Sequence, residues 1–579
     1  MAYSMGMIFI CWTVFLFYCK LGFKRLLYYH GKGAGGSLTN GYHRIILRLS
    51  ILAIFLFILN VYMFHLKYWL QAIPGVRQLS VLQGILALAL FIFYLSTMWY
   101  FAYPAYKLVF QAEIKRRSFI TSNLKLNIPI LFPWLVLSFV YDIIALSPWA
   151  GPESFLGRTE GQIVFFAVFL AILMVFMPPF IQYWWDCGPF DPSNRVDELK
   201  KFLREMGFKY RDLLRWPIFE GRMMTAGIMG IVPRYRYILM TDSLMEILSI
   251  EELKAVIAHE VGHARHRHMF FYVLFFLGYI GLSLGAFDLF FKFLASQPIF
   301  MKLLEGGGAR GADLFYLILS VPIILSIFVY FRYIMGFFMR NFERQADLYS
   351  AVIMGSPVPA VGALEKIALL SGKSRNIPSW HHFSIKERVD CLWRTLKDPG
   401  LVVRHNKFVR LSFFIYLLSI IGLGYYLNFS PIQETFNNRL INNMLQQQLE
   451  EDPENIILLQ GLAMTYYEMG RYNEARDIYE RVLLLDESQP TVLNNLAWLL
   501  VTAPDMELRD PRRALALAEK AVALERSPMF LDTLAEALYA NGSIEKAIEI
   551  ISEAISLEKE DDRYYKKQLE KFIAAREEP

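Results

Sequence analysis

The chain is poor in charged residues and in cysteine. Asp, Glu, Lys and Arg make up 19% of its 579 residues, whereas soluble domains carry about a quarter. The four cysteines are widely spaced and form no C-x-x-C pair, which argues against a disulfide framework and a thiolate zinc site. The net charge of +6 is small for this length, so nucleic acid is not an expected partner. Hydrophobic residues make up 55% of the chain, and this composition indicates an integral membrane protein.

Eight apolar runs approach or exceed the ~20 residues that cross a bilayer as a helix. They cover residues 4–19, 45–64, 79–103, 127–148, 162–185, 269–294, 313–337 and 409–428. The first run has no basic segment before it and no small-residue cleavage site, so we interpret it as a retained helix. Eight such runs are too many for the core of a soluble protein. We therefore expect a mainly α, polytopic membrane helical bundle of about eight spans.

The basic residues of the connections indicate an orientation. Residues 20–44 and 104–126 each contain five Lys or Arg, whereas 65–78 contains two and 149–161 contains one. This alternation follows the positive-inside rule. It predicts an extracytoplasmic N-terminus, cytoplasmic segments at 186–268 and 338–408, and an extracytoplasmic location for everything after the eighth run.

The region 450–579 is polar, rich in Ala, Leu and Glu, and internally repetitive. Ala475, Ala514 and Ala547 each open a similar helical segment, at intervals of 39 and 33 residues. A matching helix precedes each segment. The pattern resembles the tetratricopeptide repeat, a helix pair in which small residues let neighbouring helices approach closely. We expect an α-solenoid of about three repeats, with a plain helical bundle as the alternative.

Six of the ten histidines lie in two short segments, and four of these are in HEVGHARHRH at 259–268. Ser249 and Glu252 form an S-x-x-E capping box that predicts the start of a helix ahead of this segment. His259 and His263 then lie one turn apart on one face, with Glu260 beside them. H-E-x-x-H supplies two metal ligands and a general base, although the bare motif also fits a solvated helix end.

The second half of the same segment invites a different interpretation. His266 and His268 alternate with Arg265 and Arg267, directly before the sixth apolar run. We interpret this pair of histidines as part of a polar collar where the helix enters the membrane.

A second polar motif follows the seventh run, in RNFERQADLYSAVIMGSP at 340–357. Glu343 and Asp347 are four residues apart on one helical face, and Gly355 ends that helix. A catalytic zinc takes three protein ligands and keeps an open position for water. Glu343 is the candidate third ligand, and Asp347 is placed to hydrogen-bond a ligating imidazole.

Together, HEVGH and ERQAD resemble the integral-membrane zinc metallopeptidases that include bacterial HtpX and the eukaryotic CAAX prenyl endopeptidase. The resemblance implies one zinc ion held by His259, His263 and Glu343. It covers roughly residues 1–400, and five spans precede H-E-x-x-H as in the prenyl endopeptidase. By the same resemblance, Asp142 or Asp288 would line an intramembrane chamber.

Two further segments match this family. HFSIKERV at 382–389 is similar to its H-P-x-x-x-x-R-[IV] segment, which implies that His382 and Arg388 contact the substrate or the oxyanion. Phe383 stands where the family usually has proline. The segment 225–245 is similar to its edge strand, which implies that Thr225 and Ala226 hold extended substrate through their backbone.

The sequence therefore predicts a membrane-embedded zinc endopeptidase in which Glu260 is the general base. We divide the chain into 1–185 with five spans, 186–408 as the zinc metallopeptidase region with spans 269–294 and 313–337, the eighth span 409–428, and the repeats 450–579. Expected partners are a membrane-associated or misfolded protein substrate, the lipid bilayer and a protein bound by the repeats. The expected location is the bacterial inner membrane, with the zinc site on the cytoplasmic side.

Two alternatives stay open. One is a membrane-anchored repeat scaffold whose zinc site is only structural, although such a protein has no need of Glu260. The other is an intramembrane-cleaving protease of the site-2 type. Charged residues such as Glu251, Lys254 and Arg265 surround the motif and disfavour the second alternative, because that type buries H-E-x-x-H within an apolar span.

Overall fold

The computed structural model describes most of the chain as two compact units. The described residues are 2–31, 38–110, 113–146, 155–157, 159–221, 223–297, 299–300, 308–371, 375–558 and 562–577. Residues 147–148 of the fourth predicted run, most of the connection 149–161 and residues 559–560 near the last repeat lie outside them. The first unit comprises Met1–Leu284 and Tyr316–Gly424, and the second comprises Gly285–Phe315 and Tyr425–Pro579.

Long apolar helices confirm the prediction of an integral membrane protein with about eight spans. Seven helices among the described residues are long and apolar enough to cross a membrane, and the bent pair Arg116–Pro129 and Leu131–Ala145 makes up to eight. The helices that carry the predicted runs are α1 (Ala2–Gly31), α2 (Leu38–Tyr62), α4 (Ser80–Val109), α5 (Arg116–Ala145), α6 (Thr159–Trp184), α10 (His268–Ala295), α12 (Gly308–Val329) and α16 (Leu401–Phe429). The bend of 49° in α5 lies at Pro129, where a proline removes a backbone hydrogen bond.

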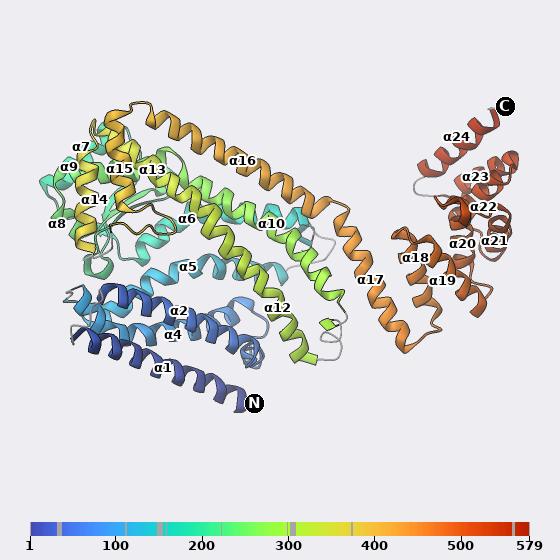
Figure 1. Cartoon of the computed structure of the whole chain (residues 1–579), viewed down its shortest axis with the longest axis horizontal. Helices are drawn as coiled ribbons and strands as arrows, with labels where there is room; N and C mark the ends of the chain where they lie inside the picture. The colour runs from blue at the N-terminus through green and yellow to red at the C-terminus, as the bar shows by residue number, and fades with distance from the viewer. Residues whose placement is uncertain are drawn as a thin grey trace. The chain divides into compact units, whose positions relative to one another are not determined.

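Helices α1, α2 and α5 pack around α4 (Figure 1), and the short helix α3 (Leu66–Gln71) contacts α2 and α4. Phe15, Tyr94 and Met98 are buried where α1, α2 and α4 meet. Asp142 of α5 is also buried, and its carboxylate accepts hydrogen bonds from the backbone N–H groups of Ser80 and Val81. The Asp142 carboxylate therefore caps the N-terminus of α4, and the role of Asp142 or Asp288 in lining a chamber stays a prediction.

A small sheet precedes the H-E-x-x-H helix in the chain. Its strands are β1 (Gly188–Pro189), β2 (Asp212–Arg215), β3 (Ala226–Met229) and β4 (Tyr237–Met240), in the order β1-β2-β4-β3. β2 and β4 are parallel, and β3 lies antiparallel to β4 at the edge. Helices α7 (Asn194–Glu205), α8 (Asp242–Ile247) and α9 (Ile250–Arg265) share one buried cluster with this sheet, to which Leu199, Ile238 and Ile257 belong.

The seventh span continues without a break into the helix that carries the second motif. A π-helical turn at Tyr330–Met335 joins α12 to α13 (Gly336–Ile353). Gly355, with φ of 66°, follows the end of α13 as predicted. Helices α14 (Val358–Ser371) and α15 (Ile385–Lys397) follow and contact α9 and α13.

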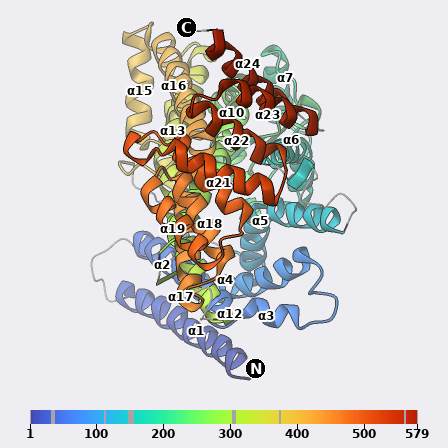
Figure 2. The same ribbon diagram turned by 90° about the vertical axis from the view of Figure 1, so that its right-hand side faces the viewer.

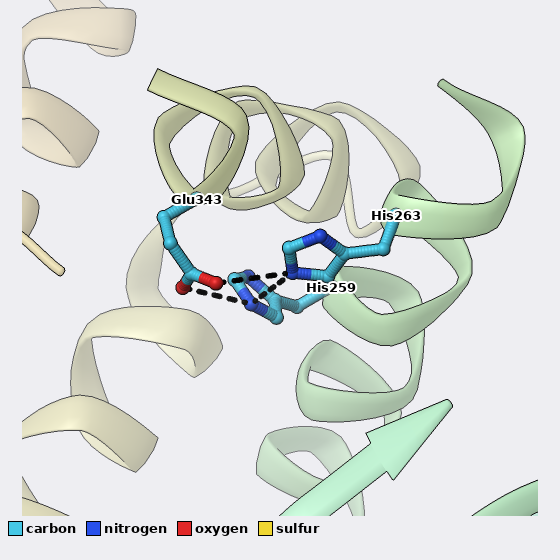
Figure 3. Close-up of side chains that lie close together, drawn as sticks. All are labelled: His259, His263 and Glu343. Atoms are coloured by element: carbon cyan, nitrogen blue, oxygen red, sulfur yellow. Dashed lines mark hydrogen bonds and ion pairs between the residues drawn. The ribbon is translucent and has the colours of Figure 1, made fainter. Parts of the chain in front are cut away.

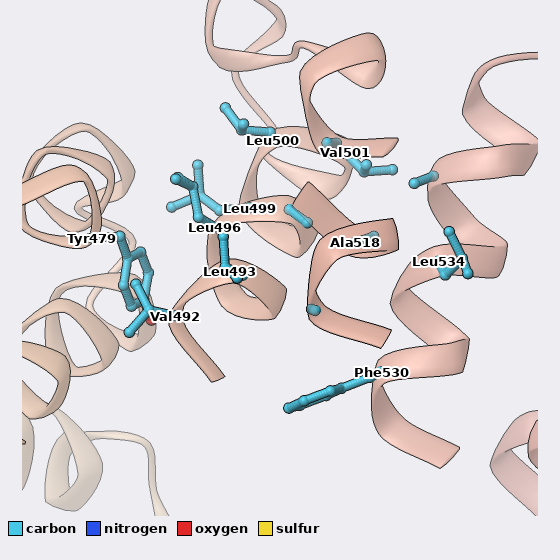
Figure 4. Close-up of a cluster of buried hydrophobic side chains, with 14 of the residues drawn as sticks. Tyr479, Val492, Leu493, Leu496, Leu499, Leu500, Val501, Ala518, Phe530 and Leu534 are labelled. Carbon is cyan, nitrogen blue, oxygen red and sulfur yellow. The ribbon is translucent and has the colours of Figure 1, made fainter. Parts of the chain in front are cut away.

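The second unit is a stack of helix pairs. Its pairs are α18 (Ile456–Glu468) with α19 (Tyr472–Leu485), α20 (Pro490–Thr502) with α21 (Pro511–Leu524), and α22 (Pro528–Ala540) with α23 (Ile544–Leu557). Helix α17 (Ile432–Glu451) precedes them and α24 (Arg563–Glu577) follows, and Figure 2 shows the pairs side by side. Ala475, Ala514 and Ala547 are completely buried at successive positions of the stack, as the repeat pattern predicts. Figure 4 shows the shared core, in which Leu496, Ala518 and Phe530 take part.

Candidate metal centre

Helix α9 begins where the capping box predicts. Ser249 Oγ accepts the N–H of Glu252 at 3.3 Å, and the Glu252 carboxylate accepts the N–H of Ser249 at 2.7 Å. Leu253, Ile257 and Val261 of this helix are completely buried against the sheet cluster. This packing fixes the rotation of α9 about its axis, and with it the direction in which the two histidines of HEVGH point.

His259, His263 and Glu343 converge on one point (Figure 3). The Nε2 atoms of the two histidines are 3.2 Å apart. Glu343 Oε2 lies 3.6 Å from His259 Nε2, and Glu343 Oε1 lies 3.4 Å from His263 Nε2. Over the part of the chain that the structure describes, these three residues form the one His/Cys/Asp/Glu group with the geometry of a metal site.

Two small residues bring the helices α9 and α13 close enough for this convergence. A Cβ atom on Gly262 would lie 3.0 Å from the Cα of Ala346 and 3.3 Å from the side chain of Tyr349. Ala346 is completely buried at this crossing. Ser350 Oγ donates a hydrogen bond to the carbonyl of Ala255 and ties the same helices together at a second point. The small residues within HEVGH and ERQAD are thus required by packing.

Each histidine has a partner on its Nδ1 side. His259 Nδ1 lies 2.9 Å from Asp347 Oδ1, and His263 Nδ1 lies 2.9 Å from His268 Nδ1. Arg388 in turn holds Asp347 through two hydrogen bonds, from Nε to Oδ2 at 2.8 Å and from Nη2 to Oδ1 at 2.7 Å. With Nδ1 engaged in this way, Nε2 of each histidine is directed toward Glu343.

The charges of the site suit a divalent cation. The site brings the carboxylates of Glu260, Glu343 and Asp347 together with one guanidinium, that of Arg388. Burial opposes a positive charge on His259, but Asp347 and Glu343 nevertheless raise its pKa to about 10. Burial lowers the pKa of His263 to about 4, which leaves its nitrogen lone pair free to bind a metal. Two imidazoles and one carboxylate, in surroundings whose carboxylates favour a positive charge, fit a zinc ion.

Glu260 follows the candidate ligand His259 in α9 and contacts the edge strand. Its Oε2 accepts a hydrogen bond from the N–H of Ile228 in β3 at 3.1 Å. Burial raises the pKa of Glu260 above its usual range, which suits a group that must both take and return a proton. In a strand, alternate residues point their backbone groups in the same direction, so Ala226 and Ile228 present theirs to the open edge.

Thr225 itself lies just before this edge strand. Its N–H donates to Thr241 Oγ1 and its carbonyl accepts the N–H of Thr241, both at 3.2 Å. The backbone of Thr225 is therefore used within the sheet, whereas the next residue, Ala226, begins the open edge.

His382 and Arg388 both reach the site, but in different ways. His382 Nδ1 lies 3.0 Å from Glu343 Oε2, and 39% of its side chain is exposed. Arg388 is 13% exposed and gives two of its donors to Asp347. Phe383, which replaces the usual proline, packs under the guanidinium of Arg344 at 4.1 Å from its ring centroid.

The structure also corrects the interpretation of the second half of HEVGHARHRH. His268 is completely buried, and its ring stacks on Phe342 with centroids 4.2 Å apart, so it is not part of a polar collar. Arg267 interrupts the helix with φ of 58°, which returns the chain toward the site. No periodic pattern continues across this interruption, so sequence spacing did not reveal that His268 contacts His263.

Comparison with known proteins identifies both parts of the chain. Residues 194–410 match peptidase family M48, and residues 442–499 match the tetratricopeptide repeat. A protease HtpX homolog of Thermoplasma acidophilum is 31% identical over 236 residues, which are 36% of this chain and 69% of that protein. The homolog of Aeropyrum pernix is 27% identical over 234 residues, covering 39% and 69% of the two chains.

Among solved structures, the crystal structure of S. mikatae Ste24p aligns with 68% of this chain and 97% of its own, at 18% identity and a TM-score of 0.38. The length and identity of the match to the Thermoplasma protein decide the assignment. This chain belongs to peptidase family M48, the family of the HtpX proteases, and combines its metallopeptidase region with tetratricopeptide repeats.

Proposed function

We propose that this protein is a zinc-dependent endopeptidase of the membrane that hydrolyses peptide bonds of membrane-associated or misfolded proteins. The observation that carries the proposal is the position of Glu260. Its carboxylate lies beside two converging histidines and Glu343, and it also touches the backbone of an open edge strand. A scaffold with a structural zinc site has no use for a buried carboxylate in this position.

His259, His263 and Glu343 would hold one zinc ion. When bound, zinc supplies Lewis-acid activation of the attacking water and of the scissile carbonyl. Glu260 takes a proton from the attacking water and passes it to the nitrogen of the leaving amine. His382 is exposed enough to donate a hydrogen bond to the carbonyl oxygen as negative charge develops on it. Arg388 acts beside it, by fixing Asp347 and through Asp347 the ring of His259.

An extended substrate would add to the sheet along β3. Ala226 and Ile228 supply the backbone groups at this edge, and the N–H of Ile228 now bonds Glu260. Recognition through the backbone carries little side-chain specificity, because every peptide offers the same N–H and C=O groups. This mode of binding agrees with a protease that acts on misfolded chains of varied sequence.

We also propose the bacterial inner membrane as the location, with the catalytic site on the cytoplasmic side. The alternation of basic residues supports this orientation, and eight spans, with the bent pair in α5 counted as one, would return the chain to the side from which it started. The repeats would then bind an extracytoplasmic partner or substrate. A reporter fused after residue 450 tests the arrangement, and reporter activity on the cytoplasmic side contradicts it.

The variant Glu260→Gln tests the activity itself. It keeps the shape of the side chain but removes the base, so hydrolysis of unfolded casein should fall about 10²–10⁴-fold while the zinc content stays unchanged. Glu251→Gln, on the exposed first turn of the same helix, is the matched control and should keep full activity. Full activity in Glu260→Gln would contradict the proposal and favour the repeat scaffold.

A further inference from the structure

A chain of buried polar side chains leads from His263 away from the metal ligands. His263 Nδ1 lies 2.9 Å from His268 Nδ1, and the other ring nitrogen of His268, Nε2, lies 3.1 Å from Gln345 Oε1. Gln345 Nε2 then donates to Asn406 Oδ1 at 2.9 Å. His268 is completely buried and Gln345 is 5% exposed, so water does not replace these partners.

Only one arrangement of hydrogens satisfies every contact of this chain when His263 binds a metal through Nε2. His263 must carry its proton on Nδ1 and donate it to Nδ1 of His268. His268 must then carry its own proton on Nε2 and donate it to the carbonyl oxygen of the Gln345 amide. The amide nitrogen of Gln345 is left to donate, and Asn406 accepts.

Packing holds the ring of His268 in the orientation that this arrangement needs. Its plane is within 6° of the plane of Phe342, and within 12° of the plane of His266. Rotation of the ring about its Cβ–Cγ bond would break both hydrogen bonds and also clash with Phe342. The imidazole is therefore preorganised before any metal binds.

This series of hydrogen-bonded side chains also joins four helices, including α16, which carries the eighth span. His263, His268 and Gln345 belong to α9, α10 and α13, whereas Asn406 belongs to the first turns of α16. A neighbouring residue of α16, His405, reaches α13 independently, with Nε2 3.1 Å from the carbonyl of Asn341. The first turns of α16 are thus fixed to the helix that supplies Glu343.

We propose that His268 is a positioning residue that directs Nε2 of His263 toward the metal, and that Gln345 and Asn406 hold His268 in this role. Helix α16, which carries the eighth span, then supports the metal site of the peptidase in addition to connecting the peptidase region to the repeats. The inference rests on the zinc site proposed above. It gives the two histidine ligands different supports, since a carboxylate holds His259 and a neutral imidazole holds His263.

Three variants of the full-length protein test this role, with zinc affinity measured by competition with a chromophoric chelator. His268→Leu removes the acceptor and should weaken zinc binding about 10–100-fold. His268→Asn places an amide oxygen near the position of Nδ1 and should recover most of that loss. Val403→Ala, at a position in the first turn of α16 that is 70% exposed, is the control and should bind zinc as the unchanged protein does.

The absorption spectrum of the cobalt-substituted protein separates positioning from folding. A change in the ligation of His263 shifts the visible bands, whereas a loss of stability alone leaves them in place. The bands should shift in His268→Leu and return in His268→Asn. If His268→Leu does not fold, Gln345→Leu takes its place, and unchanged affinity and bands in that variant would overturn the inference.

The outcomes distinguish this inference from the proposed function. If the unchanged protein binds zinc and Glu343→Gln does not, but His268→Leu binds as tightly as the unchanged protein, only the role of His268 is refuted. Equal losses in His268→Leu and His268→Asn also refute it, because the acceptor atom would then be irrelevant. If the unchanged protein binds no zinc, the proposed function fails and this inference fails with it.

Discussion

The two units of this protein organise their interiors in opposite ways. In the first unit, the candidate metal centre joins residues from distant parts of the chain, such as His259, Glu343 and Arg388, and its polar groups hold one another. In the second unit, each helix packs mainly on the next, and completely buried alanines such as Ala475 and Ala518 make the contacts. Polar pairing over long sequence separations thus specifies the catalytic region, whereas close packing of sequence neighbours specifies the repeats.

The largest expected effect comes from removing a metal ligand. Glu343→Gln keeps the volume of the side chain but removes its negative charge, so the protein should lose one equivalent of zinc and its peptidase activity. Metal analysis of the purified protein measures the first loss and casein hydrolysis the second. Hydrogen exchange in α18–α23 should not change, because the repeat core does not depend on the metal. Retention of the full zinc equivalent would show that Glu343 is not a ligand.

Removal of Arg388 should destabilise the first unit by about 3–5 kcal/mol, because it leaves the nearly buried carboxylate of Asp347 without its cation. The free energy of unfolding of Arg388→Leu is measured by denaturant titration, with hydrogen exchange in α9 and α13 as the probe of the first unit. Arg394→Leu, at an exposed position of the same helix α15, is the control and should be close to neutral. Similar stability of the two variants would mean that Asp347 does not need its partner.

In the repeats, enlarging a buried alanine should have an effect of about 1–3 kcal/mol. Ala518→Leu forces three extra carbons into a position with no exposed surface, which requires neighbouring helices to move apart. Ala516→Leu places the same side chain on the exposed side of α21 and should leave stability nearly unchanged. Faster hydrogen exchange confined to α20–α23 in Ala518→Leu, with normal zinc content, would support the contrast between the units. Loss of zinc in this variant would contradict it.

An effect of similar size, which depends on pH, concerns a buried carboxylate of the repeats that has fewer hydrogen-bond partners than Asp347 has at the candidate metal centre. Asp532 Oδ1 has no hydrogen-bond partner among the described residues, and burial raises the pKa of Asp532 to about 6. An unfolded Asp has a pKa of about 3.9, so the folded state binds the extra proton between roughly pH 4 and 6. Stability of the repeats should therefore decrease as the pH rises through this window, by up to about 3 kcal/mol.

The variant Asp532→Asn isolates this contribution. It cannot ionise, so the pH dependence of hydrogen exchange in α22 between roughly pH 4 and 6 should become flatter than in the unchanged protein. Tyr564 donates a hydrogen bond that lowers the pKa of Asp532, so the matched variant Tyr564→Phe should keep the slope and extend it to higher pH. Identical slopes for Asp532→Asn and the unchanged protein would show that Asp532 titrates normally.

Local patterns in the sequence predicted most of the elements. The apolar runs predicted the spans, and the Ser249–Glu252 box predicted the start of α9, because both depend on residues within one or two helical turns. H-E-x-x-H and E-x-x-A-D predicted three candidate ligands that the fold brings together. Their spacing reflects the same helical period, since a histidine ligand must lie one turn from the next.

The contacts that the sequence did not reveal cross from one element to another. His268 follows a break in the helix at Arg267, so helical spacing from His263 does not apply to it. Asp142 was interpreted from its place in an apolar run, whereas its carboxylate binds the N-terminus of α4, more than 60 residues earlier in the chain. Arg388 was expected to contact substrate, and its binding to Asp347 depends on how α15 packs on α13.

The sequence by itself determined that this chain spans a membrane, carries an H-E-x-x-H helix and ends in helical repeats, because periodicity and composition are properties of neighbouring residues. Only the tertiary structure decided which polar groups support each candidate ligand. That choice depends on which buried donors and acceptors meet in space, and a buried polar group is stable only with the partner that the fold brings to it.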